Sequence, residues 1–469
     1  MWKTRAVGFA VASALACSAP ALAQDSDLAR LREEMKQLQK TYEERMQALE
    51  KRLAEAEARV GKAEQASAAP PASQPAASSA RASPSAFNPA ISLILQGTYA
   101  RTSQDPNTFA ITGFVPSGGE VAPPKRSFGL GESELFITAN VDPYFRGALI
   151  AALTPENELE VEEAYFQTLS LPAGLTLKGG RFLSGIGYQN EIHQHAWDFQ
   201  DAPLPYKAFL GNRFQQDGVQ LKWVAPTPVF LELGAELGSG RAFPSSDQNK
   251  NGASAWALLA HVGGDIGESY AWRAGVSYLR TSAANRTFDD VDALGAPVTN
   301  SFTGRSRLWI ADAVLKWAPN GNATYTNVKL QAEYFRRKEN GSLSFDDSAG
   351  SGVFGTLSDA FRTAQSGWYA QGIYQFVPRW RVGYRYDALR SGTTDIGIVT
   401  NGLGPTAADF PVLARHNPTR NTLMFDFSAT ESSRLRLQLA QDKSRLGATD
   451  NQIILQYIHS LGPHGAHRF

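Results

Sequence analysis

The chain has 469 residues, and its 45 basic and 45 acidic side chains give a formal net charge of zero. A neutral chain has no long-range field that would attract nucleic acid, so no nucleic-acid partner is expected. Glycine (41 residues) and phenylalanine (25 residues) are plentiful, whereas Cys17 is the single cysteine.

The first 23 residues have the pattern of a secretory signal peptide. Lys3 and Arg5 form a basic start, residues 6–16 are apolar, and a small-residue cleavage site ends at Ala23. Lipoprotein processing at Cys17 is the alternative, because "ALAC" is a loose lipobox. Cleavage after Ala23 predicts an exported chain without cysteine, and therefore without disulfides or thiolate–metal chemistry.

Residues 24–64 contain one glycine and no proline. Their apolar residues recur in steps of three and four from Leu28 to Val60, and charges of both signs fill the other faces. Such a heptad pattern predicts a coiled coil. A single amphipathic helix lying on a membrane is the alternative, but this narrow stripe suits a helical partner better. Residues 65–88 are rich in alanine, serine and proline, which predicts a linker.

From residue 89 to residue 469 the helical period disappears, and sixteen runs alternate between apolar and polar residues. In residues 433–441, for example, Leu435 and Leu437 share one face while Arg434 and Arg436 share the other. The sixteen predicted strands are 91–100, 130–141, 144–154, 158–168, 174–183, 217–224, 228–237, 255–264, 268–280, 305–317, 325–336, 366–376, 380–389, 421–429, 433–441 and 450–460.

The segments between these strands alternate between tight turns and mostly long loops, such as 184–216, 281–304, 337–365 and 390–420. Short turns at one end and long loops at the other are typical of an outer-membrane β-barrel. A soluble all-β protein is the alternative. Sixteen strands in one ring leave an interior too wide for side chains to fill, however, so the polar face is expected to line water. The predicted fold is therefore an all-β transmembrane barrel of about 16 antiparallel strands preceded by an α-helical coiled coil.

Tryptophans near the strand ends are expected to form girdles at the two membrane interfaces. They are Trp256, Trp272, Trp309, Trp317, Trp368 and Trp380.

Alternation places basic residues of the later strands and acidic residues of the earlier strands on the inward face. The expected basic residues are Arg273, Lys329, Arg381, Arg385, Arg434 and Arg436. The expected acidic residues are Glu132, Glu134, Glu158, Glu160, Glu162, Glu232 and Glu236. Walls of opposite sign would give a transverse field, and guanidinium groups suit carboxylate, phosphate or sulfate. The alternative is that these residues pair across the barrel and stiffen it.

The long segment 184–214 is rich in aromatic residues and is expected to fold into the barrel mouth as a constriction loop. Its candidate functional residues are His193, His195, Trp197, Asp198 and Asp201. The His-x-His spacing is a candidate metal or anion clamp, but packing within a loop is the commoner role of such histidines, so no metal is expected. The sequence has no recognisable catalytic motif, and neither an enzyme nor a cofactor is expected.

Residues 161–187, "VEEAYFQTLSLPAGLTLKGGRFLSGIG", resemble the acidic-aromatic strand, turn and "GRF" strand of phosphate-selective porins O and P. With its N-terminal heptads the chain resembles Gram-negative outer-membrane porins that carry a periplasmic coiled coil, the DcaP-like group. Phe469 resembles the C-terminal aromatic residue by which the insertion machinery recognises barrels. The resemblance implies a homotrimer in a lipid bilayer that contains lipopolysaccharide. The tail "LGPHGAHRF" and the His/Asp loop depart from the family pattern, so phosphate selectivity does not carry over.

These features together predict an outer-membrane porin with its coiled coil in the periplasm, through which small polar or anionic solutes diffuse. Two alternatives remain at this point. One is a receptor for metal ions or chelates, a class that requires a plug and a 22-stranded barrel. The other is an envelope tether in which the helical rod contacts peptidoglycan and the barrel is an anchor.

Overall fold

A computed structural model describes residues 89–118 and 121–462. The predicted signal peptide, coiled coil and linker lie outside the described residues, and so does Phe469. Within the described part of the chain, no helix is both long and apolar enough to cross a bilayer.

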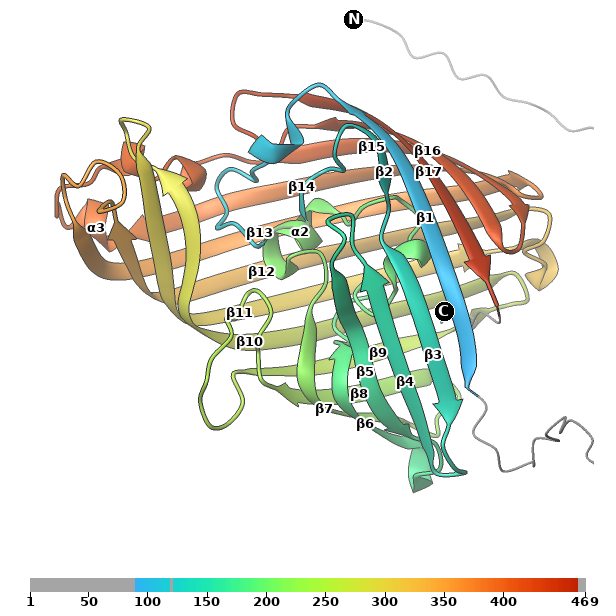
Figure 1. Cartoon of the computed structure of the whole chain (residues 1–469). Helices are drawn as coiled ribbons and strands as arrows, with labels where there is room; N and C mark the ends of the chain where they lie inside the picture. The colour runs from blue at the N-terminus through green and yellow to red at the C-terminus, as the bar shows by residue number, and fades with distance from the viewer. Residues whose placement is uncertain (1–88, 119–120, 463–469) are drawn as a thin grey trace, which may run out of the picture. The chain divides into compact units, whose positions relative to one another are not determined.

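The described strands form one closed antiparallel sheet in which each strand pairs with the next along the chain (Figure 1). The ring closes where β1 (Ala90–Thr102) pairs with β17 (Asp450–Leu461). β2 (Ser127–Leu130) and β3 (Ser133–Asn140) both pair with β1, so they occupy one position in the ring with a short interruption between them. The seventeen labelled strands therefore fill sixteen positions, which confirms the predicted barrel.

The ring has a short wall and a long wall. The short wall consists of the strands already named together with β4 (Phe145–Leu153), β5 (Leu159–Thr168), β6 (Leu175–Leu183), β7 (Gln215–Val224), β8 (Phe230–Gly238), β9 (Ala255–Ile266), β15 (Thr419–Thr430) and β16 (Ser433–Asp442). The long wall consists of β10 (Tyr270–Val291), β11 (Pro297–Trp317), β12 (Asn327–Asp346), β13 (Thr356–Val377) and β14 (Trp380–Ile396).

Helical turns occupy the connections. The α-helices are α2 (Leu204–Leu210) and α3 (Gly397–Thr400), and the 3₁₀ turns are η1 (Pro106–Thr108), η3 (Pro172–Gly174), η4 (Gln194–Ala196), η5 (Pro319–Gly321), η6 (Ala407–Asp409) and η7 (Pro411–Leu413).

The long wall corrects the sequence prediction, because most of residues 281–304 and 337–365 continue the strands instead of forming loops. The extension is stable because its inner face has an apolar core of its own, to which α3 and η7 each contribute a buried residue. Figure 1 shows α3 at this end of the long wall. The buried members of this core are Val115, Ala283, Phe288, Val298, Phe302, Leu343, Phe345, Phe361, Ile398, Phe410 and Leu413.

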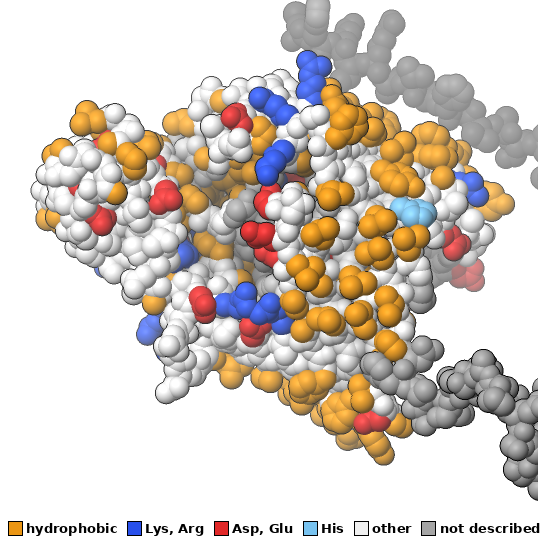
Figure 2. Space-filling model, in the orientation of Figure 1, with side chains coloured by type: hydrophobic (Ala, Val, Ile, Leu, Met, Phe, Trp, Pro, Cys, Tyr) orange, Lys and Arg blue, Asp and Glu red, His pale blue; other side chains and the backbone are white. Residues whose placement is uncertain are grey.

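The outer face of the barrel is apolar where the strands alternate. On β16, Leu435, Leu437 and Leu439 are exposed, whereas Arg436 and Gln438 between them are fully buried. Figure 2 shows hydrophobic side chains spread over the outer face of β1, β3 and β4. A closed ring with an apolar outer face satisfies every strand's hydrogen bonds internally and is the architecture that crosses a lipid bilayer with strands.

The predicted aromatic girdles lie at the two ends of this apolar face. Trp309 and Trp317 are both on β11 and are eight residues apart, which corresponds to a height of about 20 Å for a strand tilted by about 40°. Neighbouring rings extend the row at the long-loop end, because the Tyr278 ring lies 4.6 Å from that of Trp309 and 5.2 Å from that of Trp256.

A charge introduced into the apolar face tests this placement. Leu437→Arg puts a guanidinium among the exposed leucines at mid-strand, and we expect the free energy of unfolding to fall by about 2–4 kcal/mol in lipid vesicles. The control is Ser358→Arg, at an exposed position on the extension of β13. Urea unfolding of both variants in vesicles measures the effect. Equal stability of the two variants would contradict the assignment of the lipid face.

Candidate functional site

Residues 184–214, termed the inner loop, connect β6 to β7 and fold into the barrel, where Figure 1 shows α2. All seven residues of α2 are buried. Phe209 packs against Phe335 of β12, with ring centroids 6.1 Å apart, and against Phe114 at 5.7 Å. Gly211 ends the helix with φ 62°, a left-handed conformation that favours glycine. The predicted constriction loop is therefore a packed element inside the barrel.

Two aspartates attach the inner loop to the later strands. Asp198 lies 2.9 Å from Lys329 Nζ on β12 and 3.2 Å from Arg381 Nη1 on β14. Asp201 lies 3.1 Å from Arg385 Nη2 and also pairs with Arg420 of β15. Burial alone would raise the pKa of each carboxyl, but the adjacent cations outweigh it and hold both pKa values below the usual range. Both aspartates are therefore ionised at neutral pH.

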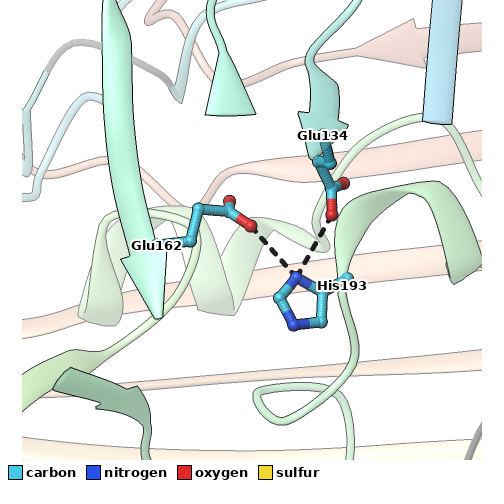
Figure 3. Close-up of side chains that lie close together, drawn as sticks. All are labelled: Glu134, Glu162 and His193. Carbon is cyan, nitrogen blue, oxygen red and sulfur yellow. Dashed lines mark hydrogen bonds and ion pairs between the residues drawn. The ribbon is translucent and has the colours of Figure 1, made fainter. Parts of the chain in front are cut away.

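A second cluster attaches the inner loop to the earlier strands (Figure 3). The Nδ1 atom of His193 lies 3.0 Å from Glu162 Oε2 of β5 and 3.3 Å from Glu134 Oε2 of β3. Its Nε2 atom lies 3.0 Å from Glu163 Oε2. Burial disfavours the charged imidazole, but hydrogen bonds to the three glutamates outweigh it and hold the pKa of His193 well above its usual value. The imidazolium therefore balances part of the negative charge.

Arg213 and His195 are the remaining partners of these glutamates. Arg213, at the end of the inner loop, lies 2.9 Å from Glu132 Oε1 and also pairs with Glu162. The Nδ1 atom of His195 lies 2.9 Å from Glu134 Oε1. We refer to His193, His195, Arg213 and their glutamates as the Glu–His cluster.

Glu134, Glu162 and His193 offer ligand atoms within 4.8 Å of one another, a spacing at which a metal ion could be held. Both ring nitrogens of His193 already face carboxylates, however. Protonated His193 and Arg213 offset part of the charge of the four glutamates. The two histidines that the sequence offered as a candidate clamp have ring centroids 6.0 Å apart, and each imidazole faces glutamates.

Two further carboxylates hold the backbone of the inner loop. Glu333 of β12 accepts hydrogen bonds from the backbone N–H groups of Tyr188 and Gln189, both at 3.1 Å, and from the hydroxyl of Tyr206 at 2.9 Å. Glu236 of β8 accepts one from the backbone N–H of Gly185 at 2.8 Å. The sequence analysis identified Glu236 but missed Glu333. Glu333 could have been found from the alternation along the strand, because it lies four residues after Lys329 and therefore faces inward as well.

The predicted basic residues all face inward, but most do not face open water. Arg385 and Arg436 are fully buried, and Arg436 Nε lies 2.8 Å from Asp426 Oδ1. Arg273 stacks over the ring of Tyr188 at 5.4 Å. These arginines therefore mostly contact other protein groups, as the alternative raised from the sequence proposed. They do not form a row of free guanidinium groups facing water.

Besides Arg273, which is half-buried, three of the predicted bases keep part of their side chains exposed. They are Lys329 at 20%, Arg381 at 21% and Arg434 at 27%, and each is within the first three residues of its strand at the tight-turn end. Arg434 Nε lies 3.9 Å from the nearest carboxylate oxygen, on Asp426. These three residues are termed the basic mouth.

The predicted separation of charges needs correction. Glu158 lies in the exposed turn before β5, and Glu160 is exposed at the start of that strand, so neither joins the Glu–His cluster. A bulge in β5 lets the adjacent Glu162 and Glu163 both reach His193, which strict alternation could not predict. Glu232 is half-buried and lies 3.0 Å from His261 Nδ1.

Buried acids also occur on the later strands, where the sequence analysis expected bases. They are Asp387, Asp426 and Asp442. The inner wall therefore alternates charges locally and does not divide into two halves of opposite sign.

Comparison with known proteins gives one relative and several solved barrels. No family model matches the chain. An "Uncharacterized protein" of Aquifex aeolicus is 30% identical over 363 residues, which cover 74% of this chain and 71% of that protein. The chain belongs to the family of that protein.

Among solved structures, the trimer form of OmpT of Vibrio cholerae is 11% identical with a TM-score of 0.48, and covers 80% of this chain and 100% of its own. OprB of Pseudomonas putida is 14% identical with a TM-score of 0.47, over 80% and 94% of the two chains. The channel DcaP of Acinetobacter baumannii is 12% identical with a TM-score of 0.45, over 81% and 99%. At these scores the strand pairing described above, and not the likeness, establishes the fold.

Replacement of Asp201 tests how the inner loop is held. Asp201→Asn leaves Arg385, Arg420 and Lys207 around a neutral amide, and we expect the free energy of unfolding to fall by about 3–5 kcal/mol. Limited proteolysis should then cut the inner loop in the folded barrel. The control is Asp247→Asn, at an exposed position between β8 and β9. Protease resistance equal to that of the control would refute this anchoring role.

The raised pKa of His193 predicts a pH dependence. A histidine whose folded pKa lies above its unfolded value near 6.5 contributes stability that is complete below that value and is lost as the pH rises through the folded pKa. We therefore expect the melting temperature to fall from about pH 6.5 upward. His193→Gln should be less stable at pH 6 and should lack this part of the slope. Parallel curves for the two proteins between pH 6 and 10 would rule out a charged His193.

Proposed function

We propose that the protein is an outer-membrane porin through which small polar solutes, preferentially anions, diffuse along the inner loop. The closed ring and apolar outer face support a membrane barrel, and the polar inward face supports an aqueous path. In this orientation the tight turns face the periplasm and the long loops face the outside.

The basic mouth is the observation that carries the preference for anions. Asp198 and Asp426 contact four bases, Lys329, Arg381, Arg434 and Arg436, so this group has an excess of two positive charges. Arg436 is fully buried and cannot meet a solute, whereas the basic mouth is partly exposed at the tight-turn end. A carboxylate, phosphate or sulfate passing there meets forked donors at little cost in desolvation.

The proposal includes an assembly that the sequence alone supports. Export by the signal peptide, three barrels joined by the periplasmic coiled coil, and a contact between that rod and peptidoglycan all concern residues outside the described ones. The sixteen strand positions of the described ring do not fit the 22-stranded receptor alternative.

Single-channel recording in planar bilayers tests the proposal. We expect stepwise openings, and a reversal potential under a salt gradient that reports a preference for anions. Arg434→Gln removes the most exposed base of the mouth and should move the reversal potential toward cation preference. The matched control is Arg336→Gln, which removes the same charge from the outer face of β12. A silent protein would reject the porin, and an equal shift in both variants would reject the role of the mouth.

A further inference from the structure

Seven basic side chains form a patch on the outer face of the long wall, termed the outer basic patch. Each has an outward position, because its neighbours along the strand are the ones buried inside the barrel. The members are Arg280, Arg305, Arg307, Arg336, Lys338, Arg362 and Arg390.

The strand register brings these charges together. Arg280 lies directly opposite Arg307, and Arg307 lies directly opposite Lys338, so three cations occupy adjacent positions across β10, β11 and β12. Like charges directly opposite each other on neighbouring strands destabilise a sheet. The fold therefore carries a repulsion at this place that an external anion would remove.

The patch contrasts with the inner wall of the same strands. Inward bases such as Arg286 and Arg337 lie beside Glu339, at 2.9 Å and 3.9 Å. Within residues 89–118 and 121–462, none of the seven outward bases has an ion pair, a side-chain hydrogen bond or a cation–π contact. Asp395 lies opposite Arg362, but its Oδ1 atom accepts a hydrogen bond from Thr400 Oγ1 at 3.2 Å.

The height of the patch matches the headgroup layer of a membrane. Arg307 occupies the next outward position from Trp309 toward the long-loop end, two residues away, which is about 7 Å along the strand. Arg336 is the register partner of Trp309 itself. Aromatic girdles mark the boundary of the hydrocarbon, so the bases beyond them lie where lipid phosphates lie.

We propose that the outer basic patch binds the phosphorylated headgroup of the glycolipid of the outer leaflet, lipopolysaccharide. Guanidinium groups bind phosphate through paired charge-assisted hydrogen bonds, and a headgroup with two phosphates matches opposed cations on three strands. The adjacent girdle packs against the acyl chains. This inference rests on the outer-membrane orientation in the proposed function but not on the solute path through the barrel.

Binding of diphosphoryl lipid A to the full-length protein in neutral detergent tests the proposal. Arg307→Gln combined with Lys338→Gln should weaken binding about 25-fold, since each base near a lipid headgroup contributes about fivefold. The matched control, Arg146→Gln with Arg379→Gln, removes two exposed bases at the tight-turn end and should bind like the wild type. Inorganic phosphate at the same phosphate concentration should not compete.

Thermal unfolding in detergent gives a second readout that a merely structural role would not produce. Without lipid A the double variant should melt at or above the wild-type temperature, because the repulsion is removed. With lipid A only the wild type and the control should gain stability. Equal affinities of the double variant and the control, or equal competition by inorganic phosphate, would overturn the proposal. Conductance in bilayers is measured separately. A double variant that loses lipid binding but opens normally would leave the proposed porin function unaffected.

Discussion

Two carboxylates inside the barrel, Asp198 and Asp201, impose the main constraint on this structure. An ionised carboxylate is stable in a buried place only when cations and hydrogen bonds replace its water. The inner loop that carries them can therefore dock only where the wall supplies bases, and the wall of β12, β14 and β15 does so with Lys329, Arg381, Arg385 and Arg420. On the opposite wall the signs are exchanged: the strands supply the glutamates of the Glu–His cluster, and the inner loop supplies its bases. The interior is thus a network of paired charges, and the bases that it leaves partly exposed are the ones available to a solute.

The strands of the long wall present bases to two different surroundings. Inward bases such as Arg286 and Arg337 are buried and paired with Glu339, so they hold the interior together. Outward bases such as Arg307 and Lys338 lie on neighbouring strands without a protein partner in the described part of the chain. In the proposed orientation the two sides differ in what they offer a base, because the lumen contains protein acids whereas the outer leaflet contains lipid phosphates. One alternating pattern can therefore encode both a stable interior and a surface matched to its membrane.

The barrel itself could be predicted from the sequence because a closed ring between lipid and a polar interior imposes strict alternation. All sixteen positions of the ring correspond to predicted strands. The extensions of the long wall could not be predicted from alternation alone, because above the membrane Phe302, Phe345 and Phe361 face an apolar core instead of water. That core depends on α3 and η7 folding back, which is a long-range contact.

The site could be predicted only in part, for a related reason. Parity along the strands placed Arg381, Arg434 and Arg436 inward, but parity does not say which acid reaches them. Their partners Asp198 and Asp426 come from the inner loop and from a neighbouring strand. The bulge in β5 interrupts the alternation, so that Glu163 also faces inward and is the third glutamate beside His193. Parity also places Glu333 inward, but its contact with the backbone of the inner loop follows only from the position of the loop.

Accessibility of inward positions along β16 tests most directly whether the inner loop is docked as described. Arg434→Cys and Gln438→Cys place single thiols at the half-exposed mouth and at a fully buried position that hydrogen-bonds the inner loop. A charged, water-soluble thiol reagent is added to open channels in a planar bilayer while the current is recorded. The account predicts a rapid fall in current for Arg434→Cys and little change for Gln438→Cys. Equally rapid reaction at both positions would show that water fills the space assigned to the inner loop, and would contradict the account.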